Sequence, residues 1–249
     1  MKKYLIFVLT VLITGNISNA QSSSGRINYT VKHDWVKKII AVDYMSKSKR
    51  EQFQYMWGSS SEYTEKSVLL FNSNSYFYEE PVDEESNYGF SWKSSEYLIY
   101  RNTKENLTYD VIRFQNKLYV IEDSIQYPKW KILNDLKEVA GHICMNASWY
   151  DEIKMNKVIA WFALDWPASF GPERYGGLPG VILEINVNDG AQIITADKIE
   201  LFDTDTIINK PSHKKKHKII NEEHYKEIMQ KYINDCKKQE TPYFWGIRY

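Results

Sequence analysis

The stretch Phe170–Ile185, FGPERYGGLPGVILEI, decides how the rest of the chain is arranged. Six of its first eleven residues are glycine or proline. Glycine reaches backbone angles that are closed to other residues, and proline fixes its own φ and restricts the residue before it. We therefore expect a loop with one prescribed path. The alternating run 181–187 follows it and leads to Asn188-Asp189-Gly190, which predicts a strand and then a hairpin turn.

The same stretch carries a resemblance to a known family. The run 175–185, YGGLPGVILEI, resembles the signature of the GLPGLI family of exported bacterial proteins, with Val181 where that signature has leucine. The preceding Ala160-Trp161-Phe162 is also similar to the family pattern, although 164–167 reads LDWP where the family usually has a Pro-Glu-Ile-Pro step. The resemblance implies an exported β protein and assigns no biochemical activity. It marks a motif loop of ten residues: Trp166, Pro167, Gly171, Pro172, Tyr175, Gly176, Gly177, Leu178, Pro179 and Gly180.

The first twenty residues have the composition of a secretory signal. Two lysines precede an apolar core at 4–13, and the small residues 18–20 offer a cleavage site before Gln21. The core is too short for a transmembrane helix, so we expect cleavage, with an N-terminal anchor as the alternative. No cysteine follows the cleavage site, which argues against a lipid anchor. We expect an exported protein of a Gram-negative envelope, periplasmic or extracellular, without a transmembrane segment after cleavage.

Length and charge restrict the remaining possibilities. Residues 21–249 are enough for one domain with a sizeable core. The whole chain has 32 basic and 32 acidic residues, and loss of the two lysines with residues 1–20 leaves a net charge of about −2. A nucleic-acid-binding domain would be basic, so we expect no nucleic-acid partner. The 19 tyrosines favour strands.

Short alternating runs separated by turn residues predict about ten strands. An acidic loop is expected at 79–85, a tight turn at Gln115-Asn116, and either a short helix or a long loop at 44–57. Because consecutive strands with short turns pair as antiparallel neighbours, we predict a mainly β fold. It would be one large curved antiparallel meander sheet or a partly open, lipoprotein-carrier-like barrel. The expected strands are 26–33, 67–72, 75–80, 95–102, 107–114, 117–123, 130–133, 139–149, 157–162, 181–187 and 191–202.

The end of the chain predicts an amphipathic helix over 221–238. Asn221 is a favourable N-cap, and Glu222 and Glu223 stand in the first turn, where the helix dipole favours acids. Apolar residues then recur at helical spacing: Tyr225, Ile228, Met229, Tyr232, Ile233 and Cys236. We expect this stripe to dock on the body of the protein, with a partner-binding helix as the alternative.

Two cysteines and one histidine are candidates for covalent or metal chemistry. Cys144 and Cys236 could form a disulfide in an oxidising compartment, or remain two separate buried thiols. His142 and Cys144 would share one face of a strand, as part of a zinc or copper site does. No third ligand stands nearby in the sequence, so we expect a packed strand with no metal and no other cofactor.

Acidic and aromatic side chains gather around the motif loop. Asp165, Glu173 and Glu184 could do acid–base work, although alternation along the strand favours a solvent-facing Glu184. The chain contains no Gly-x-Ser-x-Gly, His-Glu-x-x-His or phosphate-loop motif, so we expect no enzyme. Four aromatic residues could floor an apolar ligand site or cover the end of the core, and we favour the second: Trp161, Trp166, Phe170 and Tyr175.

These patterns predict a non-enzymatic cell-envelope protein that docks on another envelope or surface protein. The alternative is a periplasmic carrier of a lipid or other apolar ligand, held in a cavity of the curved sheet. A closed apolar cavity beneath the C-terminal helix would favour the carrier, whereas a solid core there would favour the interaction module.

Overall fold

The computed structural model describes residues 24–58, 61–80, 97–204, 206–212 and 217–249. The expected signal segment, and the acidic loop beyond residue 80, lie outside these ranges. Within them, none of the helices combines the length and the apolar character needed to cross a membrane.

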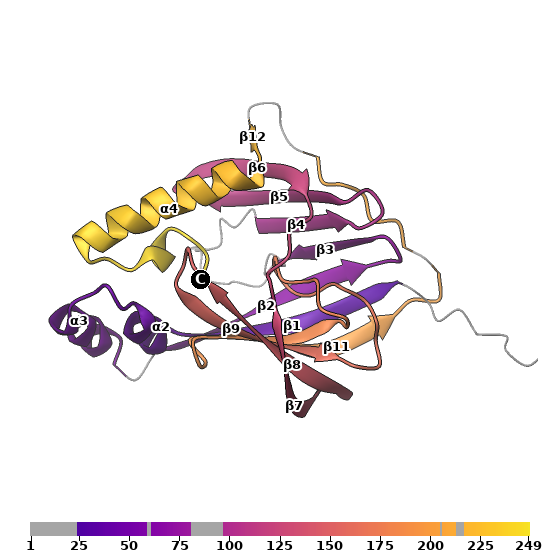
Figure 1. The fold of residues 1–249 in the computed structure, drawn as a ribbon, viewed down its shortest axis with the longest axis horizontal. Coiled ribbons are helices and arrows are strands. Elements are labelled where there is room, and N and C mark those ends of the chain that lie inside the picture. Colours follow the sequence, from indigo (N-terminus) through magenta and orange to yellow (C-terminus); the bar gives the residue numbers. More distant parts are fainter. Residues whose placement is uncertain (1–23, 59–60, 81–96, 205, 213–216) are drawn as a thin grey trace, which may run out of the picture.

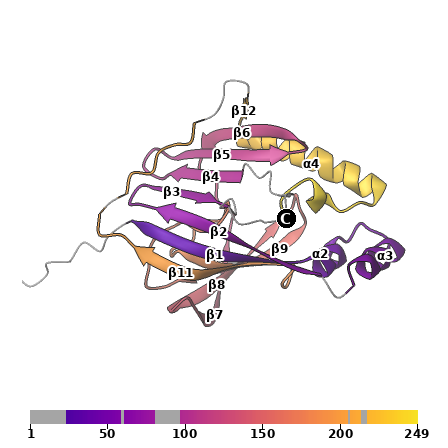
Figure 2. The same cartoon turned by 180° about the vertical axis from the view of Figure 1, so that it is seen from behind.

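The described part of the chain forms one twelve-stranded sheet (Figures 1 and 2). Its order is β12-β6-β5-β4-β3-β2-β1-β11-β10-β9-β8-β7, and every pair is antiparallel except the short parallel pair β12·β6. This confirms the mainly β fold with a large, open, antiparallel sheet. The strands are β1 (Gly25–Asp34), β2 (Glu62–Phe71), β3 (Ser75–Glu79), β4 (Tyr97–Asn102), β5 (Leu107–Phe114), β6 (Lys117–Ser124), β7 (Lys131–Val139), β8 (His142–Asp151), β9 (Asn156–Ala163), β10 (Ile182–Val187), β11 (Gln192–Leu201) and β12 (Lys218–Ile220).

Two meanders, β2–β6 and β7–β11, lie on either side of β1. Alternate residues of β1 (Ile27, Tyr29 and Val31) are fully buried, as their spacing predicts. Because β1 pairs with both β2 and β11, it joins the meanders into a single sheet.

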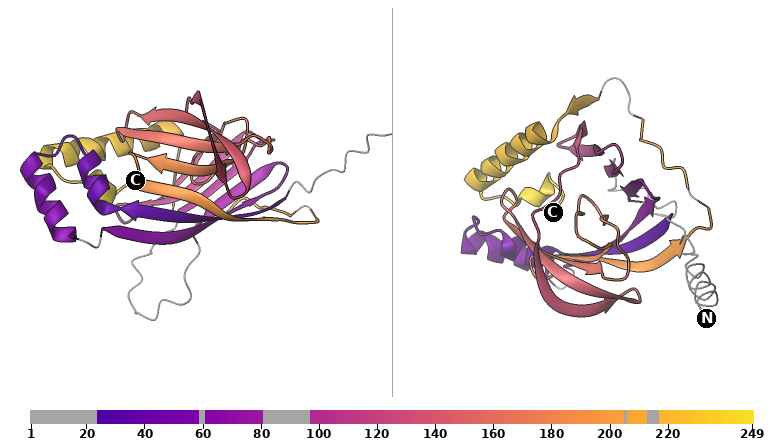
Figure 3. Two further views of the ribbon diagram at one scale, coloured as in Figure 1. Left: turned by 90° about the horizontal axis from the view of Figure 1, so that it is seen from below. Right: turned by 45° about the vertical axis from the view of Figure 1, so that its right-hand side comes forward.

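The link between the meanders forces the sheet to curve. In a flat sheet β6 and β7 would stand about ten strand spacings apart, on the order of 48 Å. Residues 125–130 join these strands, and the seven Cα steps involved span at most about 25 Å. The two sides of the sheet must therefore bend toward each other, and Figure 3 shows this curvature.

Local turn signals account for most hairpins. Gln115 and Asn116 both have positive φ (46° and 61°), as a two-residue hairpin turn requires, and Asn188 and Asp189 do likewise. The strand predicted over 139–149 is wrong at its start, because a second two-residue turn at 140–141 separates β7 from β8. Alternation continues across such a turn, so the periodicity does not reveal it.

The helices occupy one end of the curved sheet (Figure 1). α2 (Trp35–Ala41) and α3 (Lys47–Trp57) follow β1, so the ambiguous region 44–57 is mostly helical. α4 (Glu222–Gln239) confirms the predicted C-terminal helix, and the Asn221 side chain accepts a hydrogen bond from the His224 N–H at 3.0 Å. Tyr225, Met229, Ile233 and Cys236 are buried, so this helix docks on its own protein. The 3₁₀ turn η1 (Tyr243–Trp245) follows α4 and packs against the other two helices, with Phe244 on Trp35 of α2 and Trp245 on Phe53 of α3.

Candidate functional site

Backbone hydrogen bonds hold the motif loop in one shape. Phe170 and Gly176 form an isolated antiparallel bridge, and the Gly177 N–H donates to the Ser169 carbonyl at 3.1 Å. Gly177 has a φ of +83°, which favours glycine. A Cβ on Gly180 would lie 1.9 Å from the Ala163 carbonyl oxygen, so no larger residue fits there. The glycines of the motif therefore serve backbone geometry at these two positions.

Two adjacent loop residues of opposite charge bind two different parts of the protein. Glu173, at a φ of +53°, accepts a hydrogen bond from Arg248 Nε at 2.7 Å. Arg174 Nε donates to Asp110 Oδ2 at 2.9 Å, and its Nη2 donates to Glu222 in the first turn of α4. The loop thus connects the sheet to both the C-terminal segment and the C-terminal helix.

Arg248 is the centre of a buried cluster of charges. Its guanidinium also pairs with Glu80, lies 3.7 Å from Glu65, and sits 4.4 Å from the centre of the Tyr97 ring. One guanidinium therefore faces three carboxylates, all with side chains at most 10 % exposed. Such a cluster is stable only while its members stay paired.

A histidine and a lysine extend this cluster toward α2. His33 Nε2 lies 3.0 Å from Glu65, and His33 Nδ1 lies 2.7 Å from Lys38 Nζ. Burial lowers the pKa of His33 and lowers that of Lys38 to about 7. Burial alone would raise the pKa of Glu65, but the His33 hydrogen bond and the Arg248 charge lower it to about 2. For Glu80 burial prevails, and its pKa is raised. The cluster thus extends from the motif loop to Lys38, whose Nζ lies 5.8 Å from the centre of the Phe244 ring in η1.

The three carboxylates expected near the loop do not form one site. Glu173 belongs to the Arg248 cluster, whereas Glu184 pairs with Lys137 at 2.5 Å. Asp165 contacts His142 Nδ1 at 2.9 Å and is 61 % exposed. No two of the three share a partner among these contacts, so these three residues do not form the acid–base pair considered from the sequence.

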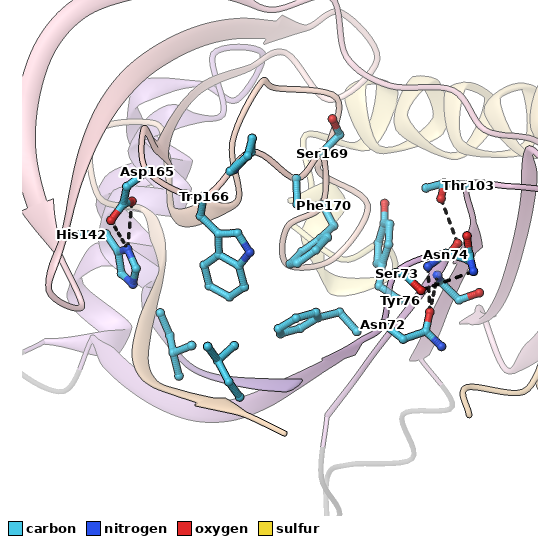
Figure 4. Close-up of a pocket in the computed structure, with 16 residues that line it drawn as sticks. Asn72, Ser73, Asn74, Tyr76, Thr103, His142, Asp165, Trp166, Ser169 and Phe170 are labelled. Carbon is cyan, nitrogen blue, oxygen red and sulfur yellow. Dashed lines mark hydrogen bonds and ion pairs between the residues drawn. The ribbon is translucent and has the colours of Figure 1, made fainter. Parts of the chain in front are cut away.

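A pocket of about 640 Å³ opens beside the motif loop (Figure 4). Trp166 and Phe170 lie at its centre, with His142 and Asp165 at one end and the turn around Asn74 at the other. The Trp166 ring packs edge-on against Phe170 and Phe71 with centroid distances of 5.9 and 5.3 Å. Other lining residues include Asn72, Ser73, Tyr76, Thr103, Ile199 and Leu201.

Only two of the four aromatic residues expected around the loop meet in this pocket. Trp166 and Phe170 line it, but Tyr175 packs against Trp130 on another side of the loop. Trp161 lies under Lys137 Nζ at 4.5 Å. Phe170 is almost fully buried and so belongs to the core, whereas Trp166 is half-buried and offers surface to a ligand.

Both cysteines are free and buried, so the structure does not contain the possible disulfide between Cys144 and Cys236. Cys144 is in β8 and Cys236 in α4, and burial raises the pKa of the Cys144 thiol to about 11. Within the described ranges, no three His, Cys, Asp or Glu side chains are grouped as a metal ion would require.

Sequence reasoning missed the Arg248 cluster. Its members come from β1, α2, β2, the end of β3, the motif loop and the last residues of the chain. None has a spacing that predicts the others. The sequence does contain one indication of this cluster: Glu173 and Arg174, two adjacent residues of opposite charge, stand within a loop of fixed shape.

Comparisons with known proteins support the fold more than any activity. A family described as "Protein of unknown function (Porph_ging)" matches residues 150–184, which include the whole motif loop. That family has a different name from the one the motif resembles. No curated protein matches the chain.

Solved structures give a more extensive likeness. Two structures of PNGF-II, in space groups P21 and C2, are similar with TM-scores of 0.54 and 0.52 at 13 % and 14 % identity. Each match covers 85 % of this chain and 34 % or 33 % of that one, so the chain spans about a third of PNGF-II. An uncharacterised conserved protein from Thermus thermophilus aligns over 86 % of this chain and 99 % of its own, with 6 % identity and a TM-score of 0.37. The chain therefore shares its fold with part of a longer protein and matches a family of unknown function over the motif loop.

Proposed function

We propose that this is an exported, non-enzymatic protein of the cell envelope that docks on another envelope or surface protein through the pocket beside the motif loop. The basic, apolar and small-residue segments of residues 1–20 support export. The fold of this chain matches about a third of PNGF-II, where it is one part of a longer chain. This likeness supports the interpretation of the present chain as a module.

One observation carries the choice of docking over carriage: the pocket between Tyr225 of α4 and the C-terminal segment is small and partly lined by charge. The pocket there has a volume of only about 120 Å³, and both Arg113 and Arg248 line it. Sites for small molecules usually measure about 300–1,000 Å³ and are mostly apolar. A lipid chain would have to displace the Arg248 cluster, so this interior favours the interaction module.

The larger pocket has the features of a docking site. It is open to the surface, and apolar Leu201 on its rim is 53 % exposed. Trp166, a residue type enriched where proteins bind each other, stands at its centre. The motif loop holds this tryptophan on a backbone of fixed shape, which reduces the entropy lost on binding.

The test combines native purification with site-specific crosslinking. A photo-crosslinking amino acid would replace Pro167, an exposed residue of the pocket, or Tyr55, which is 90 % exposed on α3 and serves as the control. Mass spectrometry of material purified from the envelope would record both proteins and lipids. We expect one protein to be crosslinked from position 167 and not from position 55. A lipid recovered in its place would support the carrier, and equal crosslinking from both positions would refute the docking site.

A further inference from the structure

Several aromatic rings of this protein are covered by a cation from their own chain. Lys137 lies over Trp161 at 4.5 Å, Lys38 over Trp35 at 4.5 Å, and Lys210 over Tyr109 at 4.4 Å. Two arginines do the same, over Tyr225 and Tyr97. A ring face attracts a cation because its π electrons make it partly negative.

Trp166 has a histidine as its basic neighbour: the His142 ring lies 5.8 Å from the Trp166 ring at an interplanar angle of 33°. Within the described ranges, no lysine or arginine of the chain lies over its ring, although the ring is half-buried in an open pocket. Its neighbour in sequence, Asp165, has a 61 % exposed carboxylate whose ion-pair partner in the described structure is His142. The sixteen residues that line the pocket include no lysine and no arginine. The Trp166 ring, whose ring neighbours are Phe71, Phe170 and His142, therefore stands beside an exposed carboxylate.

We propose that this pocket binds a basic side chain, arginine or lysine, of a polypeptide partner. The cation would lie against the Trp166 face and pair with Asp165. The half-buried Ile199 and exposed Leu201 offer apolar surface to the aliphatic part of such a side chain. This inference rests on the proposed docking function and specifies the chemistry of its partner.

The shape of the pocket favours a peptide over a small amine. Its volume of about 640 Å³ exceeds what one side chain needs. Its far end is the turn of residues 72–75, where Asn72 Oδ1 already accepts from the N–H groups of Asn74 and Ser75. The charged end thus lies opposite a neutral polar end, with aromatic rings between them (Figure 4). An extended segment with one basic residue matches that arrangement.

The inference is tested with matched peptides and purified protein. The probes are acetyl-Gly-Ser-Arg-Ser-Gly-amide and the same peptide with lysine, citrulline or norleucine in place of arginine. Citrulline keeps the shape of arginine without its charge. Titration would be followed by calorimetry and by the NMR signal of the Trp166 indole. We expect the arginine peptide to bind about tenfold more tightly than the citrulline peptide, and to lose affinity between about 0.05 M and about 0.5 M salt.

Substitutions locate the effect. Asp165→Asn should reduce arginine binding to the citrulline level, and Trp166→Leu should weaken both. If the Trp166→Leu variant does not fold, Trp166→Phe takes its place, because phenylalanine keeps an aromatic ring packed on Phe71. Asp235→Asn and Trp245→Leu, exposed residues outside the pocket, are the controls and should bind normally.

Three results would overturn the inference. They are equal affinity for arginine and citrulline, no binding of any peptide at millimolar concentration, and binding of a neutral sugar such as methyl glucoside that Asp165→Asn leaves unchanged. If position 167 still crosslinks to a protein, the docking function survives while its basic partner is rejected. If that crosslink also fails, the docking function itself is wrong.

Discussion

Replacing Arg248 by methionine should destabilise the protein strongly. The guanidinium faces Glu173 at 2.7 Å, Glu80 in direct contact and Glu65 at 3.7 Å, and these carboxylates are 6 %, 3 % and 10 % exposed. Removal of one partner from a buried ion pair costs about 3–5 kcal/mol, because the remaining charge lacks compensation. Glu173 and Glu80 lose their arginine partner here, and Glu65 keeps only His33, so we expect the upper part of that range, measured as the free energy of unfolding in urea.

An exposed ion pair supplies the control for this measurement. Lys32 pairs with Glu62 at 2.9 Å, but the two side chains are 46 % and 59 % exposed. Lys32→Met should therefore change the free energy of unfolding by less than about 1 kcal/mol.

Low pH should restore part of the stability that the Arg248→Met variant loses. Burial raises the pKa of Glu80 above its value in the unfolded chain, and without the guanidinium no arginine charge opposes this shift. The free-energy cost of burying the ionised carboxylate is present in full above the raised pKa and decreases as pH falls through it. The stability gap to wild type should therefore narrow toward about pH 4. A loss below about 1 kcal/mol at neutral pH, or a gap that widens in acid, would refute the central role of Arg248.

Four further outcomes can be measured independently. Gly180→Ala should lower the melting temperature more than Gly141→Ala, because the new Cβ meets a carbonyl oxygen at 1.9 Å at the first site, whereas at the second, with a φ of +84°, it meets open space and adds only backbone strain; equal shifts would contradict the backbone role. Ile233→Ala, at a fully buried position of α4, should lower the free energy of unfolding in urea by about 2–5 kcal/mol, and an unchanged unfolding curve would mean that the helix does not dock. Because the pKa of Glu65 is lowered to about 2, its contribution to stability should be present above its ordinary pKa of 4.5 and be lost between pH 4.5 and about 2. In a Glu65→Gln variant the free energy of unfolding should therefore fall less steeply with pH over that window. Mass mapping of the exported protein should find Gln21 at the N-terminus, and an intact Met1 would reject the signal.

Features that depend on neighbours in sequence were predictable. The turn at Gln115-Asn116 needs only two residues that tolerate positive φ, and the N-cap at Asn221 needs only a side chain that reaches the third N–H of its helix. The stripe of α4 likewise follows from its own spacing. These elements were therefore correct to within a residue or two.

Features that depend on distant partners were not predictable. The central place of β1 requires pairing of Gly25 with Leu201, and nothing in either residue identifies the other. The contact between Glu173 and Arg248 spans 75 residues. One side of the pocket was predicted, because Trp166 and Phe170 lie close together in the sequence. The other side was not, because Phe71 and Tyr76 come from β2 and β3. Sequence reasoning identified the loop, but not the surfaces that meet it.

The position of β1 also constrains the order of folding. Among the described strands β1 is synthesised first, yet one of its neighbours, β11, ends only at Leu201. Until then β2 can cover one edge of β1, while the other edge exposes unpaired backbone groups to any extended chain nearby. Contacts of such long separation slow folding. The nascent protein should therefore stay incomplete for most of its synthesis, and a chaperone that shields the open edge of β1 should raise its folding yield more than one that acts on the finished chain.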